Sequence, residues 1–259
     1  MKRVKLDISN RKDIKLSANL ELPDTGEAHS YAIFAHCFTC SKNLGAVRAI
    51  SKAMTKHGFG VLRFDFTGLG NSEGEFADSS FSSNVHDLVD MAQFLTESYS
   101  APKLLIGHSL GGAAVLFASA QLESVTAVAT IGAPSAPQHV QHLFGNSIEA
   151  IKEDGKAMVN IGGREFPISS EFITDLESKD LPKVLKRVDE SLLIMHSPQD
   201  NIVSINHASE IYLNARHPKS FISLDGADHL LSTKADAVYA GNIIAQWATR
   251  YLGAEIPEL

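Results

Sequence analysis

The chain lacks several features that would place it in a special class of protein. Its only two cysteines in 259 residues stand three positions apart, too close to form a disulfide framework for a domain of this size. No apolar run approaches the roughly 18 residues of a membrane span, and the basic start MKRVKLDISN has no apolar stretch behind it. The net charge of −7 gives no basic footprint for nucleic acid. We expect a cytoplasmic protein that binds neither membranes nor nucleic acid; the oligomeric state has no signature here.

What is present is a series of short apolar segments, in a chain that is 44% hydrophobic. Residues 2–9 and 13–23 alternate apolar and polar side chains, as half-buried antiparallel strands do. Six later runs are continuously apolar, which is typical of parallel strands buried on both faces. These runs are YAIFAH at 31–36, GVLRF at 60–64, KLLIG at 103–107, VTAVATIG at 125–132, SLLIMH at 191–196 and SFISL at 220–224. The pattern predicts an α/β fold with a mostly parallel sheet of eight strands.

Helical periodicity fills the intervals between these runs. Apolar side chains recur at helical spacing in 47–54 and 85–95, and a terminal helix is expected over about 235–252. Repeated strand–helix units place helices on both faces of the sheet. We therefore expect one domain, residues 1–259.

Residues 137–188 interrupt this rhythm, because they separate two strands by more than one crossover helix requires. The segment has helical patterns at both ends and, between them, two short strands about Gly162-Gly163. We interpret 137–188 as a lid insertion at the carboxyl edge of the sheet; the alternative is an excursion away from any site. Its apolar side chains either line an acyl or aryl pocket or pack the lid on the body. They are Leu143, Phe144, Ile148, Met158, Phe166, Ile168 and Phe172.

Two serines occupy the G-x-S-x-G pattern of a nucleophile elbow, Ser109 and Ser72. The elbow needs a strand before the serine and a helix after it. Ser109 has both, in KLLIG and LGGAAVLFASAQL, and Gly107 and Gly111 remove side chains where strand and helix meet. Ser72 follows the glycine-rich TGLG and has neither, so we interpret it as a loop residue. In the same turn, Asp65 is expected to be a structural hydrogen-bond acceptor rather than a catalyst.

A serine nucleophile needs a histidine base and an acid that orients the base. In elbow enzymes these follow the serine in the order acid, then histidine. Asp200 in HSPQD lies just past one strand, and His229 lies in the loop after the next. Asp225 and Asp228 are also close to His229, although an immediate neighbour such as Asp228 is poorly placed to meet the imidazole. We predict Ser109, Asp200 and His229 as the catalytic residues.

Acyl transfer also needs N–H donors for the developing oxyanion. In an elbow fold one donor is the amide after the nucleophile, here Leu110, and the other belongs to the loop after an earlier strand. That loop is HCFTCSKN, with Phe38 as the expected donor. Cys37 and Cys40 flank Phe38 and permit two interpretations, a pair of small inert side chains or a redox-sensitive pair that re-aims the Phe38 amide. A metal site at His36 and the cysteines lacks a clear fourth ligand, so we expect none.

These motifs together resemble the α/β-hydrolase superfamily. The resemblance rests on HCFT in place of the commoner H-G-F-T, RFDFTGLGNSEGEF, LLIGHSLGG, HSPQD and GADH, in the expected order over nearly the whole chain. FAHCFTCSKN, FSSNV and IGAPSAPQHV are most similar to bacterial serine hydrolases found alone or fused ahead of an OsmC-like peroxide-reducing domain. More distantly, the lid is similar to that of cinnamoyl and feruloyl esterases. The resemblance implies an α/β-hydrolase fold and an esterase without metal or organic cofactor; the chain is either a stand-alone member or a fragment of a longer protein.

We therefore expect a carboxylesterase that cleaves small-molecule acyl or aryl esters through an acyl-enzyme. The same three residues also suit a thioesterase, an amidase, a carbon–carbon hydrolase or a perhydrolase. A different hypothesis treats the protein as a non-catalytic thiol switch or a scaffold for a peroxide-reducing partner, and its support is the Cys37-x-x-Cys40 spacing.

Overall fold

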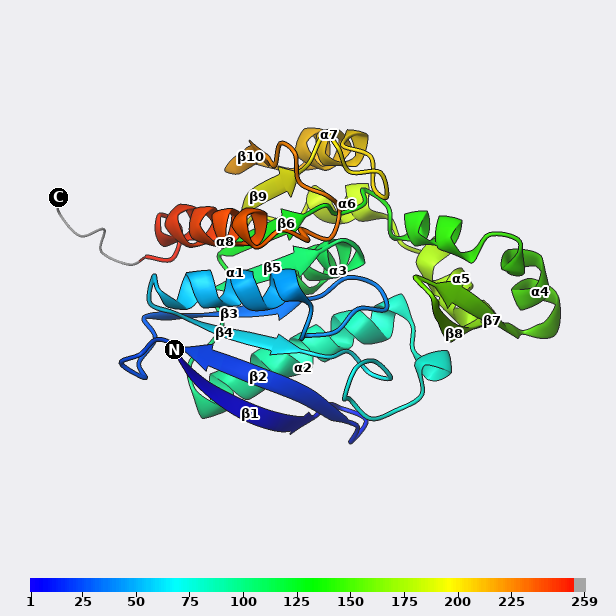
Figure 1. Ribbon diagram of the computed structural model, residues 1–259, viewed down its shortest axis with the longest axis horizontal. Helices are drawn as coiled ribbons and strands as arrows, with labels where there is room; N and C mark the ends of the chain where they lie inside the picture. The colour runs from blue at the N-terminus through cyan, green and yellow to red at the C-terminus, as the bar shows by residue number, and fades with distance from the viewer. Residues whose placement is uncertain (254–259) are drawn as a thin grey trace.

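The eight strands expected from the sequence form one sheet in the computed structural model, which describes residues 1–253 (Figure 1). From one edge to the other, the strands of this sheet are β1 (Lys2–Ser9), β2 (Lys15–Leu22), β4 (Phe59–Phe64), β3 (Ser30–Ala35), β5 (Leu104–His108), β6 (Ala127–Ile131), β9 (Ser191–His196) and β10 (Lys219–Ser223). The pairs β1–β2 and β2–β4 are antiparallel, and every other pair is parallel. The mostly parallel α/β sheet predicted from the sequence is therefore confirmed.

Helices cover both faces of this sheet, as the apolar runs require. One face carries α1 (Gly45–Thr55) and α8 (Lys234–Thr249), and the opposite core includes α2 (Phe81–Ser98), α3 (Leu110–Ser119) and α7 (Asn206–Asn214). Strands β4, β5, β6 and β9 are buried along their whole length, since side chains of both orientations meet a helical layer. None of the described helices combines the length and the apolar character that a membrane crossing needs.

The segment 137–188 projects beyond the carboxyl ends of the parallel strands (Figure 1). It contains a 3₁₀ helix (Pro137–Phe144), α4 (Ser147–Asp154), the hairpin β7 (Lys156–Ile161) and β8 (Arg164–Ser169), α5 (Ser170–Glu177) and α6 (Leu181–Leu185). Gly162 and Gly163 have φ of 59° and 82°, the pair of positive angles that a tight two-residue hairpin turn requires. The two short strands predicted about these glycines are confirmed.

Apolar and polar contacts hold this segment on the body of the protein. Phe144, Ile168 and Phe172 are buried in the core cluster that also contains α2 and α3, whereas Met158 is 57% exposed. Hydrogen bonds to Ser82 on α2 add a second attachment. The Asp175 carboxylate accepts from the backbone N–H and the hydroxyl of Ser82, and Lys179 Nζ donates to the same hydroxyl. Packing on the body is thus the main role of the buried apolar side chains.

Candidate active site

Ser109 lies at the sharp turn between β5 and α3. Its backbone has φ of 55° and ψ of −127°, a conformation that L-residues rarely adopt and that projects the side chain away from the sheet. The turn is also crowded. A Cβ on Gly107 would lie 2.3 Å from the carbonyl oxygen of Gly111, and one on Gly111 would lie 2.4 Å from that of His36. Glycine at both positions lets the start of α3 approach the strand and the loop that follows β3.

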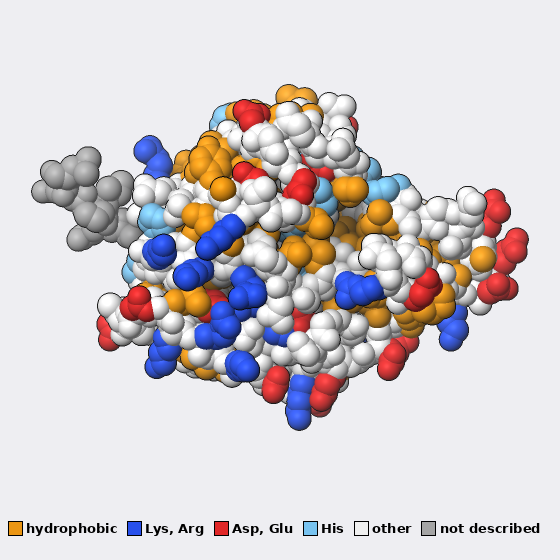
Figure 2. Space-filling view, in the orientation of Figure 1, with side chains coloured by type: hydrophobic (Ala, Val, Ile, Leu, Met, Phe, Trp, Pro, Cys, Tyr) orange, Lys and Arg blue, Asp and Glu red, His pale blue; other side chains and the backbone are white. Residues whose placement is uncertain are grey.

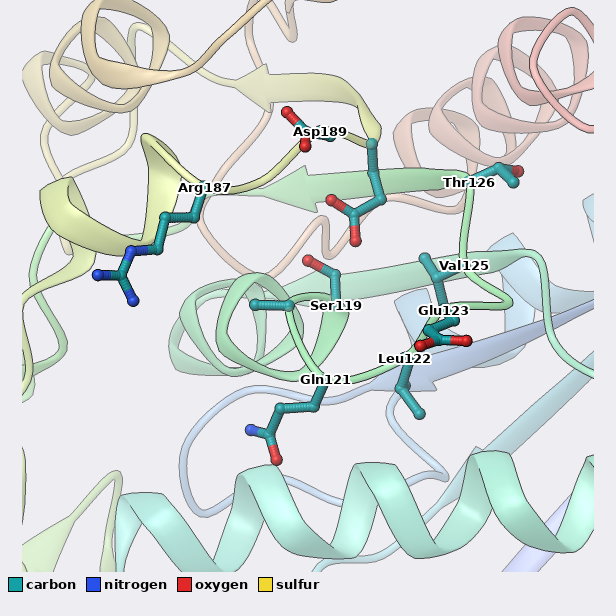
Figure 3. Close-up of a pocket in the computed structure, with 10 residues that line it drawn as sticks. Ser119, Gln121, Leu122, Glu123, Val125, Thr126, Arg187 and Asp189 are labelled. Atoms are coloured by element: carbon teal, nitrogen blue, oxygen red, sulfur yellow. The ribbon is translucent and has the colours of Figure 1, made fainter.

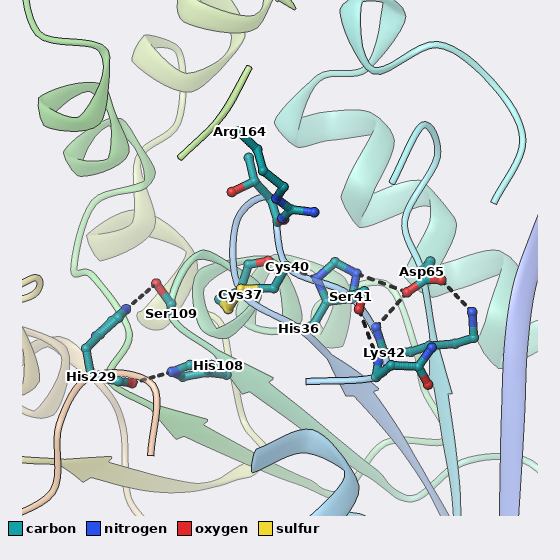
Figure 4. Close-up of a disulfide and its surroundings, with 12 residues drawn as sticks. His36, Cys37, Cys40, Ser41, Lys42, Asp65, His108, Ser109, Arg164 and His229 are labelled. Atoms are coloured by element: carbon teal, nitrogen blue, oxygen red, sulfur yellow. Dashed lines mark hydrogen bonds and ion pairs between the residues drawn. A yellow bond between two sulfur atoms is a disulfide. The ribbon is translucent and has the colours of Figure 1, made fainter. Parts of the chain in front are cut away.

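The structure brings Ser109, His229 and Asp200 into one hydrogen-bonded chain. The distance from Ser109 Oγ to His229 Nε2 is 3.0 Å (Figure 4). The distance from His229 Nδ1 to Asp200 Oδ2 is 2.7 Å. Because an ionised carboxylate only accepts, Nδ1 carries the imidazole proton and Nε2 accepts from the serine hydroxyl. This tautomer is the one in which the imidazole can remove the proton of Ser109.

Asp200 is held ionised by its hydrogen bonds. Burial alone would raise its pKa, but His229 Nδ1 and the backbone N–H groups of Val203 (2.8 Å) and Ile202 (2.9 Å) donate to the carboxylate. Together they outweigh burial and lower the pKa of Asp200 below its ordinary value. The negative charge is therefore available to stabilise a protonated His229.

The other nearby aspartates face elsewhere. Asp228 accepts from the backbone N–H of Ser232 at 2.8 Å, and hydrogen bonds from Ser232 lower the pKa of this exposed carboxyl. Asp225 accepts from the hydroxyl of Ser223 at 2.7 Å. Both shape the loop that carries His229 and neither is hydrogen-bonded to its imidazole.

Ser72 lies in a loop remote from these groups. Its hydroxyl donates to the Asp65 carbonyl at 2.6 Å and accepts from the Ser17 N–H at 2.9 Å. The Asp65 carboxylate in turn accepts from the Lys42 N–H at 2.6 Å and pairs with the Lys42 ammonium. A Cβ on Gly70 would lie 2.2 Å from this carboxylate, which explains the glycine there. Asp65 therefore acts as the structural acceptor expected, and its position beside Lys42 holds the loop after β3 (Figure 4).

That loop turns tightly at Phe38 and Thr39. The Cys40 N–H donates to the Cys37 carbonyl at 3.1 Å, and Thr39 has φ of 59°, as the third residue of a type II turn requires. The side chains of Cys37 and Cys40 are joined in a disulfide across this turn, with a Cα–Cα distance of 5.3 Å (Figure 4). The interpretation as two small inert side chains therefore needs correction, because the pair is a covalent crosslink.

The crosslink also removes the thiolate ligands on which the metal interpretation depended. Within the part of the chain that the structure describes, no three His, Cys, Asp or Glu side chains converge to hold a metal ion. In residues 1–253 the N–H of Phe38 has no protein acceptor. Leu110 occupies the first position of α3, where the backbone N–H has no partner within the helix.

Two residues to which the sequence assigned no role support the histidine loop. His108 Nε2 donates to the His229 carbonyl at 2.7 Å, and burial together with the nearby His229 lowers the pKa of His108 to about 4. Gly132 follows β6 with φ of 55°, and a Cβ there would lie 3.3 Å from Asp200 Oδ2 and 3.4 Å from His229 Nδ1. The sequence signals for these two positions are weak: a histidine directly before the elbow serine and a glycine directly after a strand.

The other two histidines that flank the site have structural partners. His36 Nδ1 donates to the Cys37 carbonyl and His196 Nε2 to the Val203 carbonyl, each at 2.8 Å. Burial lowers the pKa of both imidazoles, so both are neutral near pH 7. Each one anchors a loop that carries a candidate residue.

A pocket of about 360 Å³ opens beside Ser109 and His229, between the body and the segment 137–188. Figure 2 shows apolar and histidine side chains at the surface where this segment meets the body. The segment contributes the following lining residues: His139, Val140, His142, Leu143, Ile161, Gly162 and Arg164. The nucleophile candidate, the crosslinked loop and the inserted segment therefore share one cavity.

The model of the Hydrolase_4 family, described as serine aminopeptidase S33, matches residues 32–161, half of the chain. The chain belongs to this serine-hydrolase family. Its fold is that of the α/β hydrolases: the crystal structure of the esterase domain from a Rhodothermus marinus protein is 46% identical, with a TM-score of 0.81, and covers 98% of this chain and 100% of that one.

More distant curated relatives of this α/β hydrolase fall into two groups. The mitochondrial palmitoyl-protein thioesterase ABHD10 of Mus musculus is 26% identical over 75% of this chain and 67% of its own length. The uncharacterized protein YfhR of Salmonella typhi is 22% identical over 78% of this chain. The match spans 65% of the length of YfhR.

Proposed function

We propose that this chain is a carboxylesterase that cleaves small acyl or aryl esters, with Ser109 as nucleophile, His229 as base and Asp200 as the orienting acid. One observation carries the proposal: the chain of hydrogen bonds from Ser109 Oγ through His229 to Asp200 opens into the pocket. The 46% identity to an esterase domain over nearly the whole chain supports the same reaction.

The reaction proceeds in two acyl-transfer steps. His229 Nε2 takes the hydroxyl proton as Ser109 attacks the ester carbonyl, and the N–H groups of Phe38 and Leu110 donate to the oxyanion. The imidazolium, stabilised by Asp200, then protonates the departing alcohol. Water activated by the same imidazole attacks the acyl-enzyme and releases the acid.

The pocket favours a small substrate, and we propose 137–188 as the lid that selects it. A volume of about 360 Å³ lies near the lower end of the roughly 300–1,000 Å³ of ligand pockets. Lid residues such as Val140 and Leu143 line it together with Leu110 and Val203, so acyl or aryl groups meet apolar walls.

A thioesterase is the second candidate, because a curated relative is named a palmitoyl-protein thioesterase. The same three residues serve both reactions, and the difference lies in the leaving group. Parallel assays with an oxygen ester and a thioester of one acyl group decide between them.

The test is hydrolysis of p-nitrophenyl esters of increasing acyl length by the wild type and two variants. Ser109→Ala should lower kcat by a factor on the order of 10⁶, the loss seen when the serine of a Ser-His-Asp triad is removed. Ser72→Ala is the matched control, since the Ser72 hydroxyl bonds only to the backbone of Asp65 and of Ser17, and it should retain the activity. Equal losses in both variants, with both proteins folded, would overturn the assignment of the nucleophile.

A further inference from the structure

The charge of the pocket is one-sided. Its lining includes Arg164, His139 and His142, whereas none of the described residues that line it is an aspartate or a glutamate. The chain as a whole has 30 acidic and 23 basic residues besides histidine. Asp200 faces His229 from behind and does not line the cavity. The ionisable side chains that line this cavity are therefore all basic, although the protein as a whole is acidic.

Arg164 is the permanent charge in this lining. It begins β8, directly after the hairpin turn, and its Nη2 donates to the carbonyl of Thr39 in the crosslinked loop. Its guanidinium carbon lies 5.1 Å from the centre of the Phe166 ring. Figure 4 shows the side chain reaching to the loop that carries Cys37 and Cys40, with the disulfide drawn between it and Ser109. The hairpin thereby holds a cation beside the site.

Most N–H donors of the Arg164 guanidinium make no hydrogen bond within the described residues. It carries five N–H bonds, and within residues 1–253 only the bond to Thr39 uses one of them. No carboxylate of the described chain forms a salt bridge with Arg164. A cationic substrate would find no carboxylate partner in this pocket. With a neutral substrate, the remaining N–H groups of Arg164 would bond to water. Only an anion would use both the charge and the planar fork, which matches the two oxygens of a carboxylate.

His139 and His142 add hydrogen-bonding capacity on the lid side of the pocket. His139 Nε2 donates to the Ile202 carbonyl at 3.2 Å, and His142 Nδ1 donates to the His139 carbonyl at 2.6 Å. Each ring keeps its second nitrogen for other partners, and the two ring centres lie 4.5 Å apart. In a neutral ring this second nitrogen is an acceptor and becomes a donor to an anion only when the ring is protonated. Unlike carboxylates, these imidazoles bring no fixed negative charge next to an anion bound at Arg164.

We infer that the substrate carries an anionic group, a carboxylate or a phosphate, which Arg164 binds while the ester carbonyl lies at Ser109. This inference rests on the proposed esterase function and narrows its substrate class to anionic esters and thioesters. Arg164 is then a specificity-determining residue, and its bond to Thr39 couples the occupied pocket to the loop of the proposed oxyanion hole.

The experiment compares each anionic ester with its own neutral methyl ester. One pair places the anion in the acyl part (mono-p-nitrophenyl adipate and its methyl ester), the other in the leaving group (4-acetoxybenzoate and its methyl ester). In at least one pair, Arg164→Gln should lower the ratio of kcat/KM for anion over methyl ester by roughly tenfold or more, as expected for a lost hydrogen-bonded charge. For Arg164→Lys this ratio should lie between those of the wild type and Arg164→Gln, because lysine keeps the charge but lacks the planar guanidinium.

Arg187→Gln is the control for the loss of one positive charge. Arg187 is exposed at a second, polar cavity of about 520 Å³, whose other lining residues precede β6 and β9 at the opposite edge of the sheet (Figure 3). Its ratios should equal those of the wild type. Unchanged ratios for Arg164→Gln in both pairs, or an equal loss on anion and methyl ester, would overturn the inference. Failure of the esterase proposal is a separate outcome, in which the folded wild type shows no Ser109-dependent hydrolysis of either methyl ester.

Discussion

Replacing His108 with glutamine should remove part of the acid sensitivity of the folded protein. His108 is fully buried, and its Nε2 donates to the His229 carbonyl at 2.7 Å. Glutamine reaches a similar distance, keeps an N–H donor and stays neutral at every pH. The substitution therefore removes the titration of the side chain and preserves its hydrogen bond.

The magnitude follows from the pKa of His108, which burial and the nearby His229 lower from 6.5 to about 4. Because the folded pKa is depressed, the unfolded chain binds a proton more readily between these values. The stabilising contribution is present above about pH 6.5 and is lost as the pH falls towards 4. At 1.36 kcal/mol per pKa unit the complete loss is roughly 3.4 kcal/mol, of which about 2.4 kcal/mol falls between pH 7 and 4.5.

The assay is urea unfolding at pH 7, 6, 5 and 4.5 for the wild type, His108→Gln and His86→Gln. As the pH falls from 7 to 4.5, the unfolding free energy of His108→Gln should decrease by about 2 kcal/mol less than that of the wild type. Buried His36 and His196 also make the folded protein less stable in acid. Their contributions to the unfolding free energy are common to all three proteins and cancel in the comparison. His86 is exposed on α2, so its variant should parallel the wild type. Parallel curves for His108→Gln and the wild type would refute the reasoning.

Two further changes test the surroundings of the site. Gly132→Ala should cost about 1–2 kcal/mol of unfolding free energy through its positive φ, and should also lower kcat several-fold through contact with Asp200 and His229. Gly155 also has a positive φ but open space around it, so Gly155→Ala should lose stability alone. Urea unfolding and p-nitrophenyl ester kinetics separate the two effects, and an unchanged kcat for Gly132→Ala would contradict the assignment. Reducing the Cys37–Cys40 disulfide should lower the unfolding free energy by roughly 2 kcal/mol, the chain-entropy value for so short a loop, and should change kcat because Phe38 lies within the turn. Equal activity after diamide and after reductant, with thiol counting to verify both states, would exclude such redox sensitivity.

Local sequence patterns were sufficient for the fold. Alternation over 2–9 and continuous apolar runs elsewhere predict the strands, because burial on one face or on two leaves different periods in the sequence. The elbow at Ser109 is equally local, since a strand, two glycines and a helix define it within a dozen residues. The hairpin about Gly162-Gly163 follows from the need for positive φ at both positions.

The surroundings of the site depend on contacts between segments far apart in the chain, which no local pattern encodes. The sequence favoured Asp200 over Asp225 and Asp228 by its position after a strand, but only the structure shows that the Asp200 carboxylate meets the His229 imidazole while the other two bond within their own loop.

What the sequence by itself determined is the α/β sheet, the order of its elements and the candidate residues for acyl transfer, because periodicity and turn chemistry act over a few positions. What only the tertiary structure decided is how loops converge on Ser109: the support of His229 by His108, the crosslinked turn, and the reach of Arg164 from a hairpin 125 residues away in sequence to the Thr39 carbonyl. These contacts form only when packed layers bring distant loops to one edge of the sheet.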